Sequence, residues 1–196
     1  MMRTPIRALL ATVVLAVLTG LVYPLGMTGL AQVTMRSKAD GSVVTVSGQP
    51  VGSALIGQQW TGPQWFYGRP SATTPPDNAS ASSGSNLGPL SRQLAEEIRR
   101  RVQTIIEVDG PYHPGLKASG IPVDLLTASA SGLDPDISPP AARFQAPRIA
   151  AVRHLSLSEV QALIRSNTAG RSLGFLGEPR VNVLRLNLTL EALAGL

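Results

Sequence analysis

The longest uncharged run in the sequence lies near its N-terminus and limits what the chain can fold into. From Ala8 to Met35, no charged residue occurs over 28 positions. As an α-helix rising about 1.5 Å per residue, this run would reach roughly 42 Å, which exceeds the ~30 Å hydrocarbon core of a bilayer. Only a helix satisfies its own backbone groups in lipid. The run therefore predicts one transmembrane helix over residues 6–30, preceded by a short cytoplasmic N-terminus over residues 1–5.

A cleaved signal peptide is the alternative interpretation of this run. Arg3 and Arg7 would supply its basic region, but the apolar stretch is long for a signal peptide and continues without a clear cleavage site of small residues. Glycine and proline recur beyond Gly20, which predicts that the regular helix ends or kinks near Tyr23. The ring of Tyr23 suits a membrane interface.

The distribution of basic residues predicts the orientation of the span. Arg3 and Arg7 favour a cytoplasmic N-terminus, whereas Arg36 and Lys38 precede a long domain that can cross the membrane regardless of its charge. We therefore expect a single-pass protein of the cell (inner) membrane, with residues 31–196 forming an extracytoplasmic domain.

Small residues recur every four positions along the predicted span, at Ala8, Thr12, Ala16 and Gly20. Such a ridge lets a second helix approach closely, and in lipid this packing drives helix association. The ridge predicts a membrane partner, although small residues are also common in spans that have none.

The net charge of +5 does not indicate a nucleic-acid-binding protein. Residues 1–38 hold four bases and no acid, whereas residues 39–196 hold 13 bases and 12 acids. A nucleic-acid interface needs a basic surface on the folded domain, and here the excess lies at the membrane end. The chain contains no cysteine, which excludes disulfides, thiol catalysis and thiolate metal sites.

Beyond the span, the sequence predicts one compact α/β (α+β-like) domain. A hairpin is expected between residues 43–46 and 51–56. Apolar residues at helical spacing predict a helix from Leu90 to Ile106, with Arg99, Arg100 and Arg101 on a solvated face. Helices are also expected from residue 141 to 155, after the N-cap Ser138, and after the capping box of Ser156 and Glu159. Alternating leucines over residues 184–190 predict a half-buried strand of the core sheet.

Two stretches allow more than one interpretation. Trp60, Trp65, Phe66 and Tyr67 are half of all the aromatic residues, and they favour a core anchor under a long loop over a docking or lipid-interface patch. The Ser-, Gly- and Pro-rich residues 71–91 have the composition of a flexible linker.

No motif for catalysis stands out in the sequence. The chain has no phosphate-binding GxxxxGK[ST] loop, no GxSxG nucleophile elbow and no zinc-type spacing of His113 and His154. Asp134 and Asp136 could act as an acid and base pair in a secreted hydrolase, but Asp-Pro-Asp is also good turn chemistry, which we favour.

Five segments together resemble the C subunit of the Kdp-type potassium-transporting ATPase: TGLVYPLGMTGLAQ, GRPSAT, NASASSGSNLGP, PVDLLTASASGLDPDISPPAA and RVNVLRLNL. They occur in the family's order from the span to the C-terminus. The family motifs fall on Gly68, Arg69, Pro70, Ser71, Ser82, Ser83, Gly84, Ser85, Asn86, Asp124, Ser131, Gly132, Leu133, Asp134 and Pro135. Within residues 71–91, the match depends on specific residues at specific positions and not on composition alone. The resemblance therefore predicts that these residues form an ordered loop.

The resemblance also implies a function. The family's C subunit is an accessory subunit that assembles with a potassium-translocating subunit, a P-type ATPase subunit and often a tiny single-span subunit. It acts as a catalytic chaperone that raises the ATP affinity of the pump, and potassium and ATP act at the level of the complex. We expect no catalytic residue, metal or directly bound cofactor in this chain, and an effect on ATP through linkage between distant sites.

The alternative is a nucleotide-binding regulatory subunit that contacts ATP directly. Gln145 resembles the glutamine proposed as the family's nucleotide contact, but the chain offers no phosphate cradle. One departure from the family is Asp136, because the family usually has His at this position in GLDPHIS.

Overall fold

The uncharged run folds as one long helix in the computed structural model, which describes residues 3–194. The α-helix α1 covers Arg3–Val17, a π-helical turn covers Leu18–Val22, and α2 covers Tyr23–Thr34. The continuous helix Arg3–Thr34 is long and apolar enough to cross a membrane. The helix does not end near Tyr23, but its regular α-helical pattern is interrupted directly before this residue, as predicted. The wider π-turn lets the helix pass Pro24, which lacks the N–H of the regular pattern.

A short helix and a hairpin complete the N-terminal unit, Met1–Val51. The helix α3 covers Arg36–Ala39, and β1 (Val43–Val46) pairs with β2 (Gln49–Ser53). Both turn residues, Ser47 and Gly48, have positive φ, as a two-residue turn between twisted strands requires. The predicted hairpin is confirmed, with its second strand beginning at Gln49.

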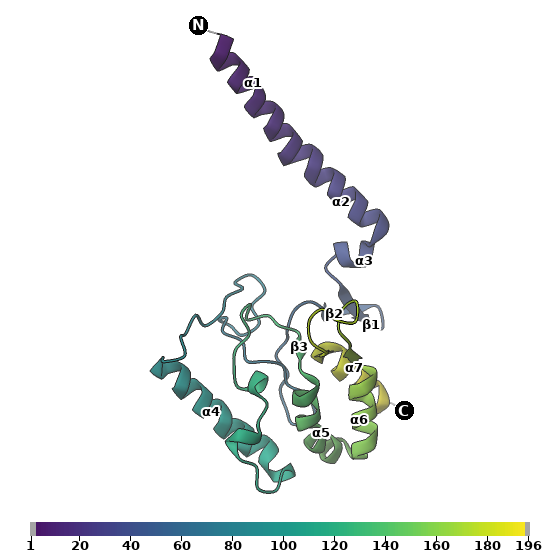
Figure 1. The fold of residues 1–196 in the computed structure, drawn as a ribbon. Coiled ribbons are helices and arrows are strands. Elements are labelled where there is room, and N and C mark those ends of the chain that lie inside the picture. Colours follow the sequence, from purple (N-terminus) through teal and green to yellow (C-terminus); the bar gives the residue numbers. More distant parts are fainter. Residues whose placement is uncertain (1–2, 195–196) are drawn as a thin grey trace. The chain divides into compact units, whose positions relative to one another are not determined.

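The C-terminal unit, Gly52–Leu196, combines helices with a small sheet (Figure 1). The sheet is antiparallel with the order β3-β5-β4, and Val181 of its central strand lies opposite both Ile137 and Thr168. Its strands are β3 (Asp136–Ile137), β4 (Thr168–Ala169) and β5 (Arg180–Asn182). The helices are α4 (Arg92–Asp109), α5 (Pro139–Arg153), α6 (Leu157–Ser166) and α7 (Val183–Ala194), with 3₁₀ turns at Gly110–Tyr112, Ala118–Gly120 and Val123–Leu125. A helix and sheet domain was predicted and is observed.

Serine caps set the start of three helices. The side chains of Ser91, Ser138 and Ser156 accept hydrogen bonds from the backbone N–H groups of the first turns of α4, α5 and α6. Glu159 completes the capping box by accepting the Ser156 N–H at 2.8 Å. These three predicted helices are confirmed, although Leu90 precedes α4 and is exposed.

The predicted strand over residues 184–190 is wrong, because these residues form most of α7. The buried side chains of Val183, Leu186, Asn187 and Leu190 follow helical spacing. The side chain of Asn182 accepts a hydrogen bond from the Arg185 N–H at 3.1 Å and caps the helix. Because α7 is buried over most of its surface, leucines at every second position lie on more than one buried side of the helix. They therefore imitate the alternating pattern of a strand.

The core of the C-terminal unit forms around α5. Figure 1 shows α5, α6 and α7 gathered together, with α4 on the other side of the unit. Alanines at positions 141, 142, 146 and 150 are buried and let neighbouring elements approach the α5 backbone closely. Ile149 of α5, Val160 and Ile164 of α6, and Leu186 and Leu190 of α7 are fully or almost fully buried in this core.

Candidate functional site: a cluster of polar loops

The segments that carry the family motifs meet in space. The hydroxyl of Ser71 donates to the carbonyl of Gly132 at 2.6 Å, and that of Ser82 donates to the carbonyl of Ser131 at 2.9 Å. The Ser129 N–H adds a backbone hydrogen bond to the Pro70 carbonyl at 3.3 Å. We call residues 57–60, 68–86 and 128–136 the loop cluster.

Two glycines allow the backbones of the loop cluster to approach each other. Gly132 has a φ of +68°, and a Cβ there would lie 2.5 Å from the Ser83 carbonyl oxygen. A Cβ on Gly84 would lie 2.7 Å from the Ala130 carbonyl oxygen. Both distances are too short for a side chain, so this packing requires glycine at these two positions.

Side-chain hydroxyls organise the turn at residues 71–78. Ser71 Oγ accepts the N–H groups of Thr73 and Asp77, and Thr73 Oγ1 accepts the N–H of Asn78. Such hydroxyl-to-backbone bonds replace the ladder of regular secondary structure. The ordered loop predicted from the family resemblance is confirmed for this turn, where the interpretation as a flexible linker is wrong.

The remaining motif residues connect the loop cluster to nearby elements. The Leu133 carbonyl accepts the Gly57 N–H at 2.8 Å, and the Pro135 carbonyl accepts the N–H of Val183 at the start of α7. The Asp124 carboxylate accepts the N–H of Ser138, the N-cap of α5, at 2.8 Å. Ser85 accepts a long bond from the Leu87 N–H, and Asn86 between them adopts a left-handed conformation.

A cavity of about 320 Å³ opens within the loop cluster, and Gly68 is part of its wall. Arg69 and Asp134 both line this cavity and form an ion pair, with 3.0 Å between Arg69 Nη1 and Asp134 Oδ2. Gln59 donates to Asp77 on the same wall. Arg101 also lines the cavity and is partly buried, pairing with Glu97 and donating to the Leu126 carbonyl. The prediction that Arg101 belongs to a solvated face is therefore wrong.

Asp134 and Asp136 have separate partners, which favours the turn over an acid and base pair. Asp134 faces Arg69 and accepts the Asp136 N–H at 3.1 Å, as an Asp in a turn does. Asp136 pairs with Arg180 at 3.1 Å and accepts a hydrogen bond from Asn182 at 3.2 Å. Burial raises the pKa of Asp136, while Asn182 and Arg180 oppose this shift. Across residues 3–194, the structure shows no group of three His, Cys, Asp or Glu residues that could hold a metal ion.

The aromatic cluster is anchored in the core, as predicted for Phe66. Phe66 is fully buried, and the Asn187 amide bonds both its N–H and its carbonyl at 2.9 Å. The Gln145 amide likewise accepts the Tyr67 N–H at 2.8 Å and donates to the Tyr67 carbonyl at 3.1 Å. Trp60 packs against the core.

Arg148 contacts this aromatic segment and was not among the residues predicted from the sequence. Its guanidinium is fully buried, pairs with Asp109 at 2.8 Å and stacks over the Tyr67 ring. It also donates to the carbonyls of Pro63 and Trp65. Burial raises the pKa of Asp109, and the charge of Arg148 opposes this shift. The one sequence signal was an arginine three residues after Gln145, on a side of α5 that also carries Ala141, Phe144 and Val152.

Gln145, the candidate nucleotide contact, lies inside the unit. Its side chain is buried, and its amide bonds the Tyr67 backbone, with a further contact to Arg148 at 2.9 Å. A nucleotide could reach this amide only after the Tyr67 segment had moved. His113 stacks on Phe144, and His154 ends α5 in a left-handed conformation, so the two histidines have separate structural positions.

The ridge residues Ala8, Thr12, Ala16 and Gly20 all lie in the continuous helix and are exposed in the described chain. The Thr12 hydroxyl donates to the Ala8 carbonyl one turn earlier, so it is satisfied within its own helix. Its small side chain remains compatible with close approach by a second helix.

Comparison with known proteins gives consistent matches along the whole chain. A family model described as K+-transporting ATPase, c chain, matches residues 5–192. A potassium-transporting ATPase KdpC subunit of Variovorax paradoxus is 54% identical over 96% of this chain and 95% of the relative. A protein with the same description from Herpetosiphon aurantiacus is 51% identical over 100% of this chain and of the relative. Another, from Burkholderia ambifaria, is 51% identical over 97% of each chain.

Proposed function

Because this chain belongs to the K+-transporting ATPase C-chain family, we propose that it is an accessory, non-catalytic subunit of an ATP-driven, high-affinity potassium import complex. The match over residues 5–192 carries this proposal. In the proposed complex, the chain assembles with the potassium-translocating subunit, the ATP-hydrolysing subunit and a small single-span subunit.

The long N-terminal helix is the proposed anchor in the cell (inner) membrane. Its length and apolar composition support a span, and Arg3 and Arg7 favour a cytoplasmic N-terminus. The C-terminal unit would then lie outside the cytoplasm, near the outer face of the potassium-translocating subunit. The ridge from Ala8 to Gly20 would pack against helices of the partner subunits.

The proposed effect on ATP is indirect. A subunit that binds one pump conformation more tightly than another raises the affinity for any ligand of the favoured conformation. The buried position of Gln145, with its amide bonded to the Tyr67 backbone, supports this mechanism over direct contact with a nucleotide.

Co-purification tests the assembly role. We expect deletion of the residues 3–34 helix to abolish recovery of the chain with the other subunits. The double variant A16L/G20L should reduce recovery about tenfold, because bulky side chains prevent close helix packing. The matched control V14L/V22L enlarges two residues elsewhere on the same helix and should leave recovery unchanged. Intact assembly without the helix would overturn the anchoring role.

The ATP effect is tested by measuring the KM for ATP of the complex with and without this chain. We expect a higher KM without it, and no ATP binding by the detergent-solubilised chain alone. Binding to the chain alone, lost in a folded Q145A variant, would instead favour a direct nucleotide-binding regulatory subunit.

Cysteine labelling tests the orientation, because the chain has no cysteine of its own. Ser131 and Ser119 are exposed, so S131C and S119C provide two independent reporters. A membrane-impermeant maleimide should label both in cells whose inner membrane is intact. Labelling of both only after lysis of that membrane would place the C-terminal unit in the cytoplasm and overturn the proposed orientation.

A further inference from the structure

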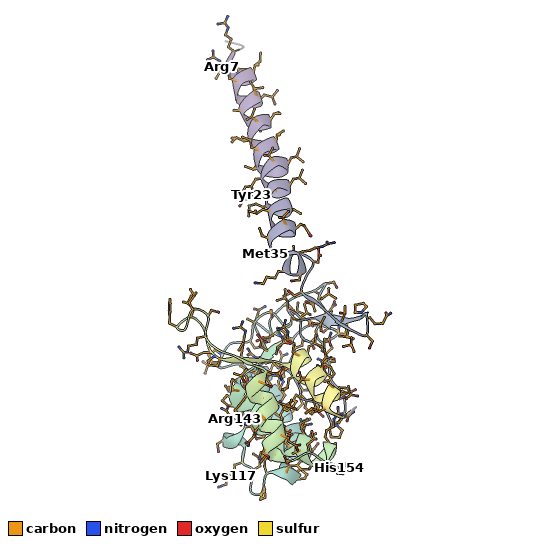
Figure 2. All side chains as sticks on the ribbon, turned by 90° about the vertical axis from the view of Figure 1, so that its right-hand side faces the viewer. Arg7, Tyr23, Met35, Lys117, Arg143 and His154 are labelled. Atoms are coloured by element: carbon orange, nitrogen blue, oxygen red, sulfur yellow. The ribbon has the colours of Figure 1, made fainter. Side chains whose placement is uncertain are left out.

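An exposed apolar segment joins β4 to β5 in the C-terminal unit. We call residues 171–178 the apolar arm. The side chains of Leu173, Phe175 and Leu176 in this arm are 82%, 68% and 50% exposed. Figure 2 shows this yellow-green segment extending away from the helices of the unit. Three large apolar side chains gathered on one exposed loop are typical of an interaction site.

The apolar arm has a defined backbone structure. Ser172 and Leu176 exchange two backbone hydrogen bonds of 2.9 Å, which closes the tip into a small hairpin. At its base, Arg171 Nη2 bonds both carboxylate oxygens of Glu178, at 2.9 and 2.8 Å. A preformed tip loses less conformational freedom on binding than a flexible segment does.

The tip also holds a leucine in an unfavourable backbone conformation. Leu173 has a φ of +54°, a region that residues other than Gly, Asn and Asp rarely adopt. Local strain combined with exposed apolar side chains is expected where function, rather than stability, determines the residue.

The position of the arm's base indicates which side of the unit it serves. The base continues into β5, and Asn182 at the end of β5 donates to the Ala54 carbonyl at 2.9 Å. Ala54 follows β2, where the chain arrives from the N-terminal helix. The strand that follows the arm therefore ends beside Ala54, close in sequence to where the chain enters the C-terminal unit.

The charges around the arm favour a protein partner over a lipid surface. Arg171 is paired with Glu178, and Arg180 at the base is paired with Asp136. Loops that bind anionic lipid use unpaired Lys and Arg, and interfacial anchors use Trp and Tyr. The arm contains one aromatic residue, Phe175, and one basic residue, Arg171, which is paired with Glu178.

From these observations, we propose that the apolar arm docks into an uncharged, apolar pocket on a membrane-embedded partner subunit of the potassium-transport complex. This inference rests on the proposed function, because it requires that the chain assembles with such a subunit. The arm would fix the C-terminal unit to the complex at a second point, separate from the membrane helix.

Reconstitution tests the energetic role of the arm. A complex purified without this chain is titrated with detergent-solubilised full-length chain, either unchanged or as L173S/F175S. We expect the variant to need an about tenfold or higher concentration for half-saturation, as for loss of a central apolar contact. The control V123S, at another exposed apolar side chain, should stay within about twofold of the unchanged chain. Equal half-saturation for L173S/F175S and the unchanged chain would overturn the proposal.

Photo-cross-linking identifies what the arm contacts. A photoreactive amino acid replaces Phe175, and the intact complex is irradiated in its membrane. A cross-link to another subunit supports the proposal, whereas a cross-link to lipid, or none in an assembled complex, overturns it. If the unchanged chain fails to assemble at all, the proposed function fails first, so the two failures are distinguishable.

Discussion

The loop cluster and the apolar arm are both irregular, but they differ in how they are held. The loop cluster is polar, and its serines and glycines bond or closely approach backbone groups of neighbouring loops. The arm is apolar, exposed from Arg171 to Glu178, and closed by its own hairpin and ion pair. The composition of residues 71–91 in the loop cluster suggested a flexible linker. The arm, by contrast, contains residues that are normally found in a core.

The difference shows that order in a loop depends on where its hydrogen bonds go. Ser71 organises a turn because its hydroxyl reaches two N–H groups and one carbonyl. Leu173, Phe175 and Leu176 add no such bonds through their side chains. We therefore expect substitutions in the loop cluster, and in the buried contacts of the segment 63–67 that leads into it, to change stability. Substitutions at the arm's tip should change binding.

The largest expected effect is that of Arg148→Met, because this arginine holds the segment 63–67 that leads into the loop cluster. The variant leaves Asp109 buried without its cation and the carbonyls of Pro63 and Trp65 without their donor. We expect a loss of about 3–5 kcal/mol in the free energy of unfolding. Urea unfolding of the detergent-solubilised chain, followed by tryptophan fluorescence, measures it.

The matched control is Arg143→Met, which removes an exposed arginine from the same helix. It should change the free energy of unfolding by less than about 0.5 kcal/mol. A similar small change for Arg148→Met would show that the stability of the unit does not depend on the buried guanidinium and its contacts with residues 63–67.

The second effect is that of Gly132→Ala in the loop cluster. The new methyl group would collide with the Ser83 carbonyl and the Thr73 side chain, in a backbone conformation unfavourable to alanine. We expect a loss of about 2 kcal/mol, measured by the same unfolding experiment. Gly170→Ala is the control, since a Cβ there meets nothing within 4 Å. If both variants unfold alike, the close approach of the two loops is not needed for stability.

The third effect concerns Asp136, which pairs with Arg180 at the base of the arm. Because burial raises its folded-state pKa, the folded state holds this proton at pH values where the unfolded state has lost it. This carboxyl therefore lowers stability as the pH rises from the ordinary Asp range through the raised pKa.

Asp136→Asn should remove this contribution. We expect the stability of the unchanged chain relative to the variant to increase as the pH falls through that window, by less than about 1 kcal/mol for a partly exposed group. Urea unfolding of both proteins between pH 7 and pH 4 measures the difference. A relative stability that falls over the same range would mean that the Arg180 and Asn182 contacts outweigh burial.

The smallest effect is expected at the tip of the arm. Leu173→Asn places a residue that tolerates positive φ where a leucine is strained. Stability should be unchanged or rise by up to about 1 kcal/mol, while binding to the complex weakens. Thermal unfolding measures the first and the reconstitution titration the second. A clear loss of stability would show that the leucine packs against the unit, which would remove the contrast with the loop cluster.

The sequence predicted those parts of the fold that depend on local signals. Ser138 and the Ser156–Glu159 box are local caps, and the apolar residues from Leu94 to Ile106 form a local helical pattern. The helices predicted from these signals were located to within a few residues. Residues 184–190 were misassigned because alternating leucines satisfy a strand pattern as well as a largely buried helix. Asn182 is a good N-cap just before this stretch and could have indicated the helix.

The sequence predicted which residues belong to the loop cluster but not how they are arranged in space. Motif identity selected Arg69, Ser71, Gly132 and Asp134, yet no local rule shows that these residues meet across distant loops. The Arg148–Asp109 pair escaped prediction for a related reason. Its burial arises where the end of α4, α5 and the segment 63–67 pack together, and composition records only two ordinary charged residues.

Asn182 has a mechanical consequence for a chain tethered at one end. Its side chain bonds the Ala54 carbonyl and the Asp136 carboxylate, and it caps α7 through the Arg185 N–H. A pull on the N-terminal helix would reach the C-terminal unit at Ala54 and load β5 and the first turn of α7 together. Tension from a moving partner would therefore be shared by the sheet and a core helix, instead of peeling the first residues away from the unit.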